Sequence, residues 1–406
     1  MTAEGEAWLV DLTRLASRIG HGPMTGVDRV EHAYLRELMA RPVQVFGLVR
    51  TGFGFLLLDR AGMARLAALV EGREAAPRAG ALARLMRRRQ PRRADAEAAL
   101  RRVAVARVPV PLLAWMLRRH LPAGFRYLNL GHANLTPRVF AAVHAVPGAR
   151  AGVLLHDVIP LDHPGLTRGG IPEVFARKLA AVAVGADLVI HTTAAGRRRD
   201  EAQLVRFGRV PPGRVARLGV PVPVPVPAEV PAGLDLSAPY FVVLGTIEPR
   251  KNHALLLDIW EKLPPEAGLR LLVLGGRGWR NEAVFRRLDA LAPGGRVVER
   301  AGLSDGAVAA VLAGARALLF PTFAEGTGLP ALEAAALGVP VICSDLPELR
   351  EVMGDYPVYL APTDGYAWSE VIGSIEQAGG SSRDRGDGFV LPSWKDHFNE
   401  TLSPDW

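Results

Sequence analysis

The hydrophobic positions of this chain fall into short apolar runs that alternate with stretches of helical periodicity. In the first half, strands are predicted at residues 7–12, 126–130, 151–157 and 187–191, and helices at 28–39, 172–185 and 195–207. In the second half, strands are predicted at 241–244, 271–274, 297–299 and 317–320, and helices at 254–263, 282–291 and 305–313. This alternation predicts an α/β fold class with parallel, doubly wound sheets of the Rossmann type.

A run of alternating valine and proline, residues 220–227, separates the two halves. Alternating proline enforces an extended, semi-rigid path, and 406 residues have room for two hydrophobic cores. We therefore predict an N-terminal domain at 1–219, a linker at 220–236 and a C-terminal domain at 237–378. Residues 379–406 are expected to form a mobile loop and a last helix that packs back on the first domain. The alternative for the proline run is a docking peptide.

The net charge of +8 hides a division between the halves. Up to Val220 there are 34 Lys and Arg against 17 Asp and Glu, and after it 15 against 24. Residues 60–120 are strongly cationic and are interpreted as a basic insertion. Within them, residues 84–119 are expected to contact an anionic membrane. Nucleic acid is the rival partner, and a solvated arginine-rich surface is the third interpretation.

A single cysteine, Cys343, excludes a disulfide framework and suggests a reducing compartment. The start of the chain has no long apolar run, so no signal peptide is expected, and no uncharged stretch reaches transmembrane length. We therefore expect a cytoplasmic protein that associates with the inner face of a membrane.

The segment at residues 325–333 places one acid on a glycine-rich loop and a second acid inside the helix that follows. Pro330 suits the first helical position and Gly338 the position just past the end, so a short helix is predicted over residues 330–337. Its free N–H groups open onto Gly326, Thr327 and Gly328, which makes this helix start an anion site.

Two carboxylates flank this cradle, an arrangement that suits a nucleotide sugar. Glu333 could accept the vicinal hydroxyls of a ribose, and Glu325 could meet another part of the same ligand. The pair resembles the paired-glutamate motif of the retaining GT-B glycosyltransferases of family 4 (glycosyl transferases group 1), and residues 320–330 and 338–345 resemble that family's donor-binding block. From the residues alone, a capped structural helix with Glu333 as a surface acid is the alternative.

The resemblance covers most of the chain, most firmly Tyr240 to Leu360. It implies the GT-B architecture, in which two Rossmann-like domains face each other across a cleft. It also implies that Gly326, Thr327, Gly328 and Leu329 bind the donor, with Glu325 among the catalytic residues.

A second predicted phosphate site follows the strand at 241–244, where a glycine turn leads to Arg250 and Lys251 at a helix start. In the resembled family a lysine at the position of Lys251 holds the leaving diphosphate. Many members carry arginine directly after the strand's glycine, where this chain has Thr246, so the second cation is expected to be Arg250 or Arg277. A solvated helix start is the alternative, although cations are unfavourable there without an anion.

Two further positions join the predicted site. His156, in a His-Asp strand end, resembles the family histidine that faces the transferred sugar, especially in members that act on mannose-like donors; a structural histidine is the alternative. Gly26 would allow close backbone approach to the donor or acceptor, or would simply form a turn. No Asp-x-Asp occurs and no Cys/His cluster suggests zinc, so we expect no metal or other cofactor, with Lys251, Arg250 and a helix end in place of the metal.

These features predict a retaining glycosyltransferase that moves a mannose-like hexose from a nucleotide-diphospho-sugar to a glycan or lipid-linked acceptor in surface polysaccharide biosynthesis. Its catalytic residues would be Glu325, His156 and Lys251. A nucleotide-sugar epimerase or hydrolase of the same fold is one alternative. A non-enzymatic binder of membranes or nucleic acid, driven by the basic half, is the other.

Overall fold

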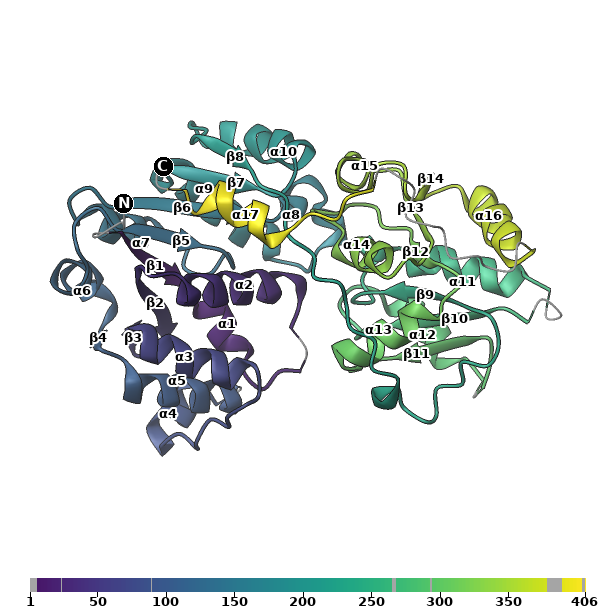
Figure 1. Ribbon diagram of the computed structural model, residues 1–406, viewed down its shortest axis with the longest axis horizontal. Coiled ribbons are helices and arrows are strands. Elements are labelled where there is room, and N and C mark those ends of the chain that lie inside the picture. The colour runs from purple at the N-terminus through teal and green to yellow at the C-terminus, as the bar shows by residue number, and fades with distance from the viewer. Residues whose placement is uncertain are drawn as a thin grey trace.

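The computed structural model describes residues 6–22, 24–88, 90–264, 268–292, 294–377, 389–403 and 406. Figure 1 shows two α/β domains side by side, with the N-terminal half of the chain in one and most of the C-terminal half in the other. The loop predicted at 380–388 lies outside the described residues.

The first domain is built on a sheet with the strand order β4-β3-β2-β1-β5-β6-β7-β8. Its strands are β1 (Ala7–Asp11), β2 (Gln44–Thr51), β3 (Gly54–Leu58), β4 (Ala106–Val108), β5 (Arg126–Asn129), β6 (Arg150–Leu155), β7 (Leu188–His191) and β8 (Gly213–Val215). The strands from β2 through β1 and β5 to β8 run parallel, as predicted. The edge formed by β3 and β4 is antiparallel, and here the prediction of a parallel sheet was wrong.

The antiparallel edge follows from a tight turn. Only Gly52 and Phe53 separate β2 from β3, and a connection this short joins antiparallel strands because parallel ones need a crossover. Gly54 begins β3 with a φ of 125°, and a Cβ there would lie 2.0 Å from the carbonyl oxygen of Val108, the last residue of β4. A larger residue at position 54 would therefore break this edge.

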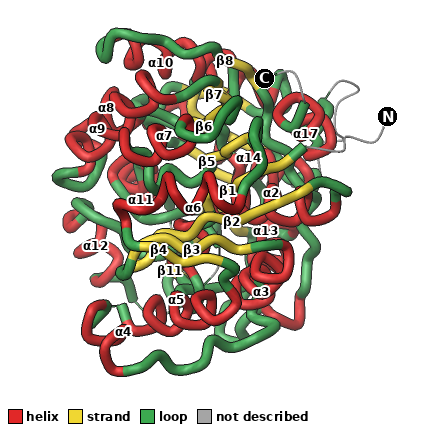
Figure 2. The backbone as a smooth tube through the Cα atoms, turned by 90° about the vertical axis from the view of Figure 1, so that its left-hand side faces the viewer, coloured by secondary structure: helices red, strands yellow, loops and turns green. Residues whose placement is uncertain are grey.

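Helices cover both faces of this sheet (Figure 2). They are α1 (Thr13–Arg18), α2 (Gly26–Ala40), α3 (Arg60–Val70), α4 (Ala81–Met86), α5 (Pro91–Val103), α6 (Leu113–His120), α7 (Pro137–His144), α8 (Ile159–Asp162), α9 (Ile171–Gly185) and α10 (Ala194–Val205), with 3₁₀ turns η1 (Val110–Leu112) and η2 (Pro164–Leu166). Side chains of β1 alternate between two cores, Trp8 and Val10 in one and Ala7 and Leu9 in the other, as the pleat requires.

Residues 60–120, predicted as a basic insertion, are built into the first domain. Met63 of α3 and Leu100 of α5 are fully buried in the same core as Trp8. Several arginines of this region are held by acids: Arg84 pairs with Asp95, and Arg87 and Arg93 pair with Glu97. Three arginines of the block at residues 84–93 are therefore held by two acids, Asp95 and Glu97.

The second domain has a parallel sheet with the order β11-β10-β9-β12-β13-β14, the strand order of a doubly wound dinucleotide-binding fold. Its strands are β9 (Tyr240–Leu244), β10 (Arg270–Leu274), β11 (Val297–Arg300), β12 (Leu318–Phe320), β13 (Val341–Ser344) and β14 (Val358–Leu360). Its helices are α11 (His253–Lys262), α12 (Glu282–Asp289), α13 (Asp305–Ala313), α14 (Leu329–Ala336), α15 (Pro347–Met353) and α16 (Gly365–Gln377), with 3₁₀ turns η3 (Pro227–Glu229) and η4 (Pro249–Lys251).

The last helix, α17 (Trp394–Thr401), lies against the first domain although the chain reaches it from the second. Nε2 of His397 lies 2.8 Å from the hydroxyl of Tyr34 on α2, and the ring of Phe398 packs edge-on against Tyr34. Figure 1 shows α17 in yellow beside the purple and blue elements of that domain. Two segments therefore cross between the domains, this one and the proline run.

Candidate active site between the domains

The carboxyl ends of strands from both sheets face the cleft between the domains. His156 follows β6 of the first domain, and Glu325 and Gly326 follow β12 of the second. A Cβ built on Gly326 would lie 2.4 Å from the carbonyl oxygen of His156, so the two backbones touch across the cleft. Only glycine fits at position 326 in this closed arrangement.

The charged side chains of Arg250, Lys251 and Glu325 meet at the carboxyl-terminal ends of strands in the second sheet. Nζ of Lys251 donates to Oε1 of Glu325 at 2.6 Å, and Arg250 donates to the same oxygen. Arg250 also pairs with Glu248, Nη2 to Oε1 at 2.8 Å, and donates to the carbonyl oxygen of Ala324 at 2.8 Å. The two cations predicted for the diphosphate site thus lie together, on the turn η4 that precedes α11.

Burial and charge compete in this cluster. Burial opposes ionisation of Glu325, but Arg250 and Lys251 outweigh it and lower the pKa of the carboxyl below its usual value. Burial also disfavours the charged form of Arg250, yet Glu325 and Glu248 raise its pKa. For Lys251, burial lowers the pKa although Glu325 opposes that change. Lys251 therefore carries the least firmly held charge of the three, and an added anion would strengthen it.

The loop before α14 is fixed by hydrogen bonds to the cationic turn. The hydroxyl of Thr322 lies 3.1 Å from the carbonyl oxygen of Arg250, and the amide of Phe323 donates to that oxygen at 2.8 Å. Gly328 has a φ of 76° and precedes the helix, which begins at Leu329 with Pro330 in its first turn. The short helix predicted at 330–337 is thus present, one residue earlier, with Thr327 buried just before it. The predicted row of free N–H groups is not formed, because Pro330 has no N–H and the amide of Ala331 donates to the carbonyl oxygen of Gly328 at 2.9 Å.

His156 lies at the first-domain side of the cleft with its ring held by the backbone. Its Nε2 atom is 2.7 Å from the carbonyl oxygen of Leu130. Because a carbonyl oxygen only accepts, Nε2 carries the proton and Nδ1 is left as an acceptor. Burial lowers the pKa of His156 to about 4, so the ring is neutral near pH 7. A neutral imidazole with a free acceptor suits a sugar hydroxyl better than a phosphate.

Glu333 lies in the first turns of α14, but its carboxylate meets the other domain. Nη1 of Arg29, on α2, donates to Oε1 of Glu333 at 2.5 Å, and Nη2 of Arg29 donates to Oδ1 of Asp305 at 2.9 Å. Close by, a Cβ built on Gly26 would lie 3.1 Å from the Leu329 side chain. Gly26 therefore lies close to α14, and its predicted approach to the donor or acceptor stays a prediction.

A cavity of about 310 Å³, here called the cleft cavity, lies between the start of α2 in the first domain and the strand ends and α14 of the second. It is lined by first-domain residues Met24, Gly26 and Arg29 and by second-domain residues that include Gly245, Thr246, Gly275, Arg300, Asp305, Leu329, Pro330 and Glu333. Gly275 packs so closely on the strand end at Gly245 that a Cβ on it would lie 2.0 Å from the Gly245 carbonyl oxygen. Glycine at position 275 therefore permits this close packing of two strand ends beside the cavity.

Two residues of the site were not singled out from the sequence. Arg29 pairs with both Glu333 and Asp305, and it does so only because the two domains meet. A contact between domains leaves no periodic pattern in the local sequence. Conversely, Arg277, one of two candidates for the second cation, pairs with Glu299 and Asp289 near the edge of the sheet. Arg250 is the cation that shares an acid with Lys251.

In the part of the chain that the structure describes, no helix combines the length and the apolar character needed to cross a membrane. Over the same residues, no group of three or more His, Cys, Asp or Glu side chains is arranged to hold a metal ion.

Residues 238–376 match the family model described as glycosyl transferases group 1. The O-antigen chain mannosyltransferase B of Escherichia coli is 37% identical over 127 residues, which are 31% of this chain and 33% of that protein. The serotype-specific mannosyltransferase WbdA of Escherichia coli is 29% identical over 262 residues, 60% of this chain and 32% of that protein. The chain thus spans about a third of the length of these curated relatives.

Among solved structures, HepE of Anabaena in complex with UDP-glucose superposes with a TM-score of 0.61 at 13% identity. The superposition covers 97% of this chain and 95% of that one. At this identity the likeness concerns the fold, and it confirms the predicted GT-B architecture of two Rossmann-like domains. The resemblance to glycosyl transferases group 1 is confirmed as well, for residues 238–376.

Proposed function

Because residues 238–376 match the glycosyl transferases group 1 family and the chain has the GT-B fold, we propose that this protein is a glycosyltransferase of surface polysaccharide biosynthesis. It transfers a mannose-like hexose from a nucleotide-diphospho-sugar to a glycan or lipid-linked acceptor. The observation that carries the proposal is the convergence of Lys251 and Arg250 on Glu325, directly across the cleft from His156.

The donor diphosphate binds where Glu325 now neutralises two cations. Lys251 and Arg250 turn to the phosphate oxygens, and the positive end of the α14 helix dipole faces the diphosphate from the other side. Fixed charges of this kind stabilise the leaving group without reorganising during the reaction. In this proposal they replace a metal ion, and no cofactor takes part.

The sugar lies between Glu325 and His156. Once the diphosphate satisfies the cations, Glu325 is free to accept hydroxyl hydrogen bonds, and Nδ1 of His156 accepts another from the opposite domain. Neither side chain is required as a nucleophile in the retaining front-face substitution that we propose. The leaving phosphate helps to deprotonate the acceptor on the face from which it departs, and positioning supplies much of the rate.

The choice of a mannose-like sugar is supported by the names of the relatives. Both Escherichia coli proteins described above are mannosyltransferases, and one is assigned to the O-antigen chain. We propose GDP-mannose as the donor on this basis, together with the His-Asp strand end at residues 156–157.

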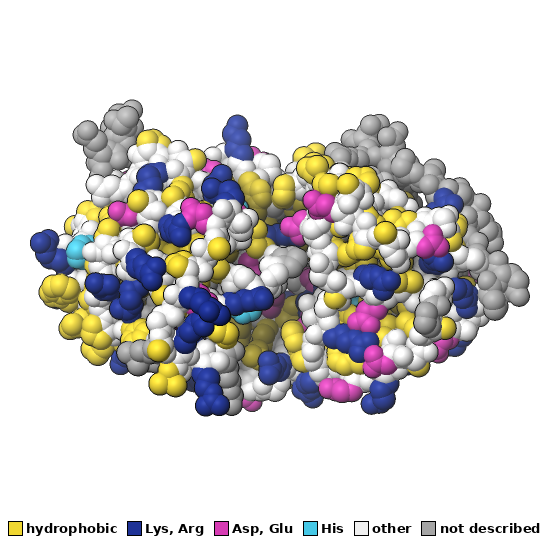
Figure 3. Space-filling view, turned by 90° about the horizontal axis from the view of Figure 1, so that it is seen from below, with side chains coloured by type: hydrophobic (Ala, Val, Ile, Leu, Met, Phe, Trp, Pro, Cys, Tyr) yellow, Lys and Arg dark blue, Asp and Glu magenta, His cyan; other side chains and the backbone are white. Residues whose placement is uncertain are grey.

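A membrane-facing surface is part of the proposal. On α6 and the turn before it, Trp115 and Leu112 are 57% and 48% exposed, and Arg118 and Arg119 are exposed beside them. Figure 3 shows that Lys and Arg gather over the first domain on the face seen from below, whereas on the second domain they alternate with acids. We propose that this α6 surface, formed by Leu112, Trp115, Arg118 and Arg119, meets anionic lipid and brings the cleft to a lipid-linked acceptor.

Nucleic acid is not a partner in this proposal. In the basic block at residues 84–93, Arg84, Arg87 and Arg93 form ion pairs with acids of the same domain. Fewer arginines are therefore available to bind phosphate than the sequence suggested. An epimerase or hydrolase on the same fold is the other enzymatic candidate.

Incubation with GDP-mannose separates these possibilities. A transferase releases GDP rapidly only when a saccharide acceptor is present, and the product of a retaining enzyme keeps the α configuration of the donor. Rapid turnover without any acceptor would favour the epimerase or hydrolase. No turnover and no affinity for any of GDP, UDP, ADP and dTDP would leave the proposal without support.

A further inference from the structure

The ion pair between Arg29 and Glu333 joins the two domains at the cleft. Arg29 lies in the first turn of α2, whose start is fixed by a capping box between Thr25 and Asp28. The Glu333 side chain is 14% exposed and the Asp305 side chain 60% exposed, so one guanidinium bridges a shielded acid and an open one. Both acids belong to the second domain, at α14 and α13, so a single side chain of the first domain holds two helices of the other.

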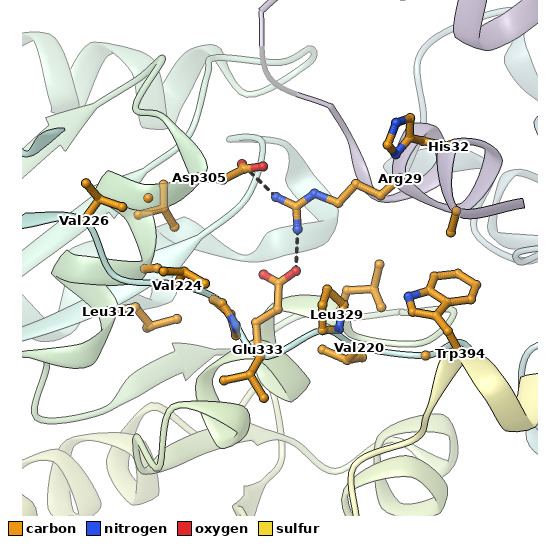
Figure 4. A pocket seen from close by; sticks show the side chains of 18 of the residues that line it. Arg29, His32, Val220, Val224, Val226, Asp305, Leu312, Leu329, Glu333 and Trp394 are labelled. Atoms are coloured by element: carbon orange, nitrogen blue, oxygen red, sulfur yellow. Dashed lines mark hydrogen bonds and ion pairs between the residues drawn. The ribbon is translucent and has the colours of Figure 1, made fainter. Parts of the chain in front are cut away.

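This pair also forms a wall between two cavities. On one side is the cleft cavity. On the other lies a cavity of about 520 Å³, here called the linker cavity, lined by Val220, Val222, Val224, Val226, Leu312 and Trp394. Figure 4 shows Arg29 reaching across from α2, with Glu333 below it and Asp305 beside it. Arg29, Asp305, Leu329 and Glu333 line both cavities.

The geometry leaves Glu333 able to bind a ligand while Arg29 holds it. The hydrogen bond from Arg29 reaches Oε1, and Oε2 of the same carboxylate is a second acceptor in a group that lines the cleft cavity. Arg29 retains Asp305 as a partner whether or not Glu333 moves. A nucleotide could therefore reach Glu333 without leaving the guanidinium unpaired.

We propose that Arg29 is a positioning residue for the donor ribose: from the first domain it holds and aims the Glu333 carboxylate, so that the ribose binds tightly only when the domains are closed. This inference rests on the proposed function, because it takes Glu333 as the ribose acceptor. It assigns to α2 a part in nucleotide recognition that couples closure of the cleft to donor binding.

Electrostatics supports the same role. Burial raises the pKa of Glu333, and Arg29 opposes that rise. Loss of Arg29 would leave a shielded carboxylate without its cation, and it would take up a proton at higher pH. The other charged groups that line the two cavities beside Glu333 are Asp305, Arg300, His32 and Glu229. His32 pairs with Glu71, and Glu229 accepts a hydrogen bond from Ser304.

The test compares Arg29→Gln with Arg36→Gln, a control on the same helix whose side chain is 57% exposed and pairs with Glu71. Binding of GDP and of 2′-deoxy-GDP, or of whichever of GDP, UDP and ADP binds most tightly and its 2′-deoxy form, is measured by calorimetry from pH 6 to 8.5. We expect wild type and Arg36→Gln to prefer the ribose form. Arg29→Gln should bind it about tenfold more weakly, with little preference over the deoxy form.

The pH series identifies the cause. In Arg29→Gln the preference for the ribose form should return as pH rises, because Glu333 then ionises. Glu333→Gln should lack this preference at every pH. Because that variant still contains His32, its result separates titration of Glu333 from titration of His32. An unchanged affinity and preference in Arg29→Gln, or tighter binding, would overturn the inference while leaving the proposed function intact. A wild-type protein that binds none of the diphosphates would instead overturn the proposed function itself.

Discussion

Lys251 and Glu325 meet at 2.6 Å, Nζ to Oε1, although 74 residues separate them in the chain. The ammonium also lies 4.3 Å above the centre of the Phe320 ring, which shields the pair from one side. The carboxylate of Glu325 thus pairs with the cation that the proposed diphosphate needs. Donor binding then exchanges one anion for another instead of creating a new buried charge.

This exchange predicts opposite effects of one substitution on binding and on turnover. Glu325→Gln removes the internal anion, so Lys251 and Arg250 should bind a free nucleoside diphosphate several-fold more tightly. Turnover should nevertheless fall by about 100-fold, because the sugar loses a charged acceptor. Calorimetry with GDP and a steady-state transfer assay measure the two quantities. Glu299→Gln, which removes an acid from the Arg277 pair, is the matched control. Weaker GDP binding in Glu325→Gln would contradict the exchange.

The contact between Gly326 and His156 predicts a steric effect on closure. A methyl group at position 326 would meet the His156 carbonyl oxygen at 2.4 Å, so Gly326→Ala should hold the domains apart. We expect kcat/KM to fall at least about tenfold while the melting temperature changes little, since misplacement of reacting groups is costly. Gly373→Ala on α16, where an added Cβ has open space, should match wild type. Wild-type kcat/KM in Gly326→Ala would show that this closed contact is not needed.

His156 predicts a defined pH dependence of stability. Its pKa is lowered to about 4 in the folded chain against about 6.5 when unfolded, so the unfolded chain binds the extra proton first. Above about pH 6.5 the ring is neutral in both states, so it does not change the free energy of unfolding. As pH falls from 6.5 toward 4, the unfolded chain binds a proton that the folded chain does not, and the free energy of unfolding decreases. Relative to His156→Asn, wild type should lose on the order of 2 kcal/mol by pH 4.5.

Thermal or urea unfolding at pH 7 and pH 4.5 measures this difference. His120→Asn, at the exposed end of α6, is the control and should follow wild type. Equal pH slopes for wild type and His156→Asn would indicate that the ring is solvated and titrates normally.

The α6 surface predicts lipid binding that depends on both charge and apolar area. Trp115→Ser should reduce binding to vesicles with anionic headgroups by several-fold, and Arg119→Glu should weaken it further while making it less sensitive to salt. Tyr366→Ser, which alters an aromatic residue that is 76% exposed on the second domain, is the control. Vesicle sedimentation at two salt concentrations measures the effect. Equal vesicle binding by wild type and all variants would contradict a lipid contact at the α6 surface.

Much of the fold followed from local patterns in the sequence. Parallel strands buried on both faces read as short apolar runs, and Pro330 and Gly338 marked the ends of α14 almost to the residue. The antiparallel edge at β3 and β4 was missed because it depends on the turn at Gly52 and Phe53 and on Gly54, which sit inside an apolar stretch.

The candidate site was predictable only in part, for a related reason. Lys251, Glu325 and Glu333 stand out because each belongs to a strand-loop-helix unit with a glycine turn. Their present partners could not be foreseen, since the Arg29–Glu333 pair depends on how two domains meet. The same holds for Glu351, which caps α10 of the other domain by accepting from the amides of Ala194 and Ala195.

The most direct measurement is the rate of sugar transfer by wild type and Lys251→Ala, each with and without EDTA. If fixed protein charges take up the negative charge of the departing diphosphate, wild type keeps its rate in EDTA. Lys251→Ala should be slower by about 100-fold or more under both conditions, whereas Lys262→Ala, on the exposed end of α11, should match wild type. A wild-type rate that vanishes in EDTA and returns with Mg²⁺, or an undiminished rate in Lys251→Ala, would contradict this mechanism.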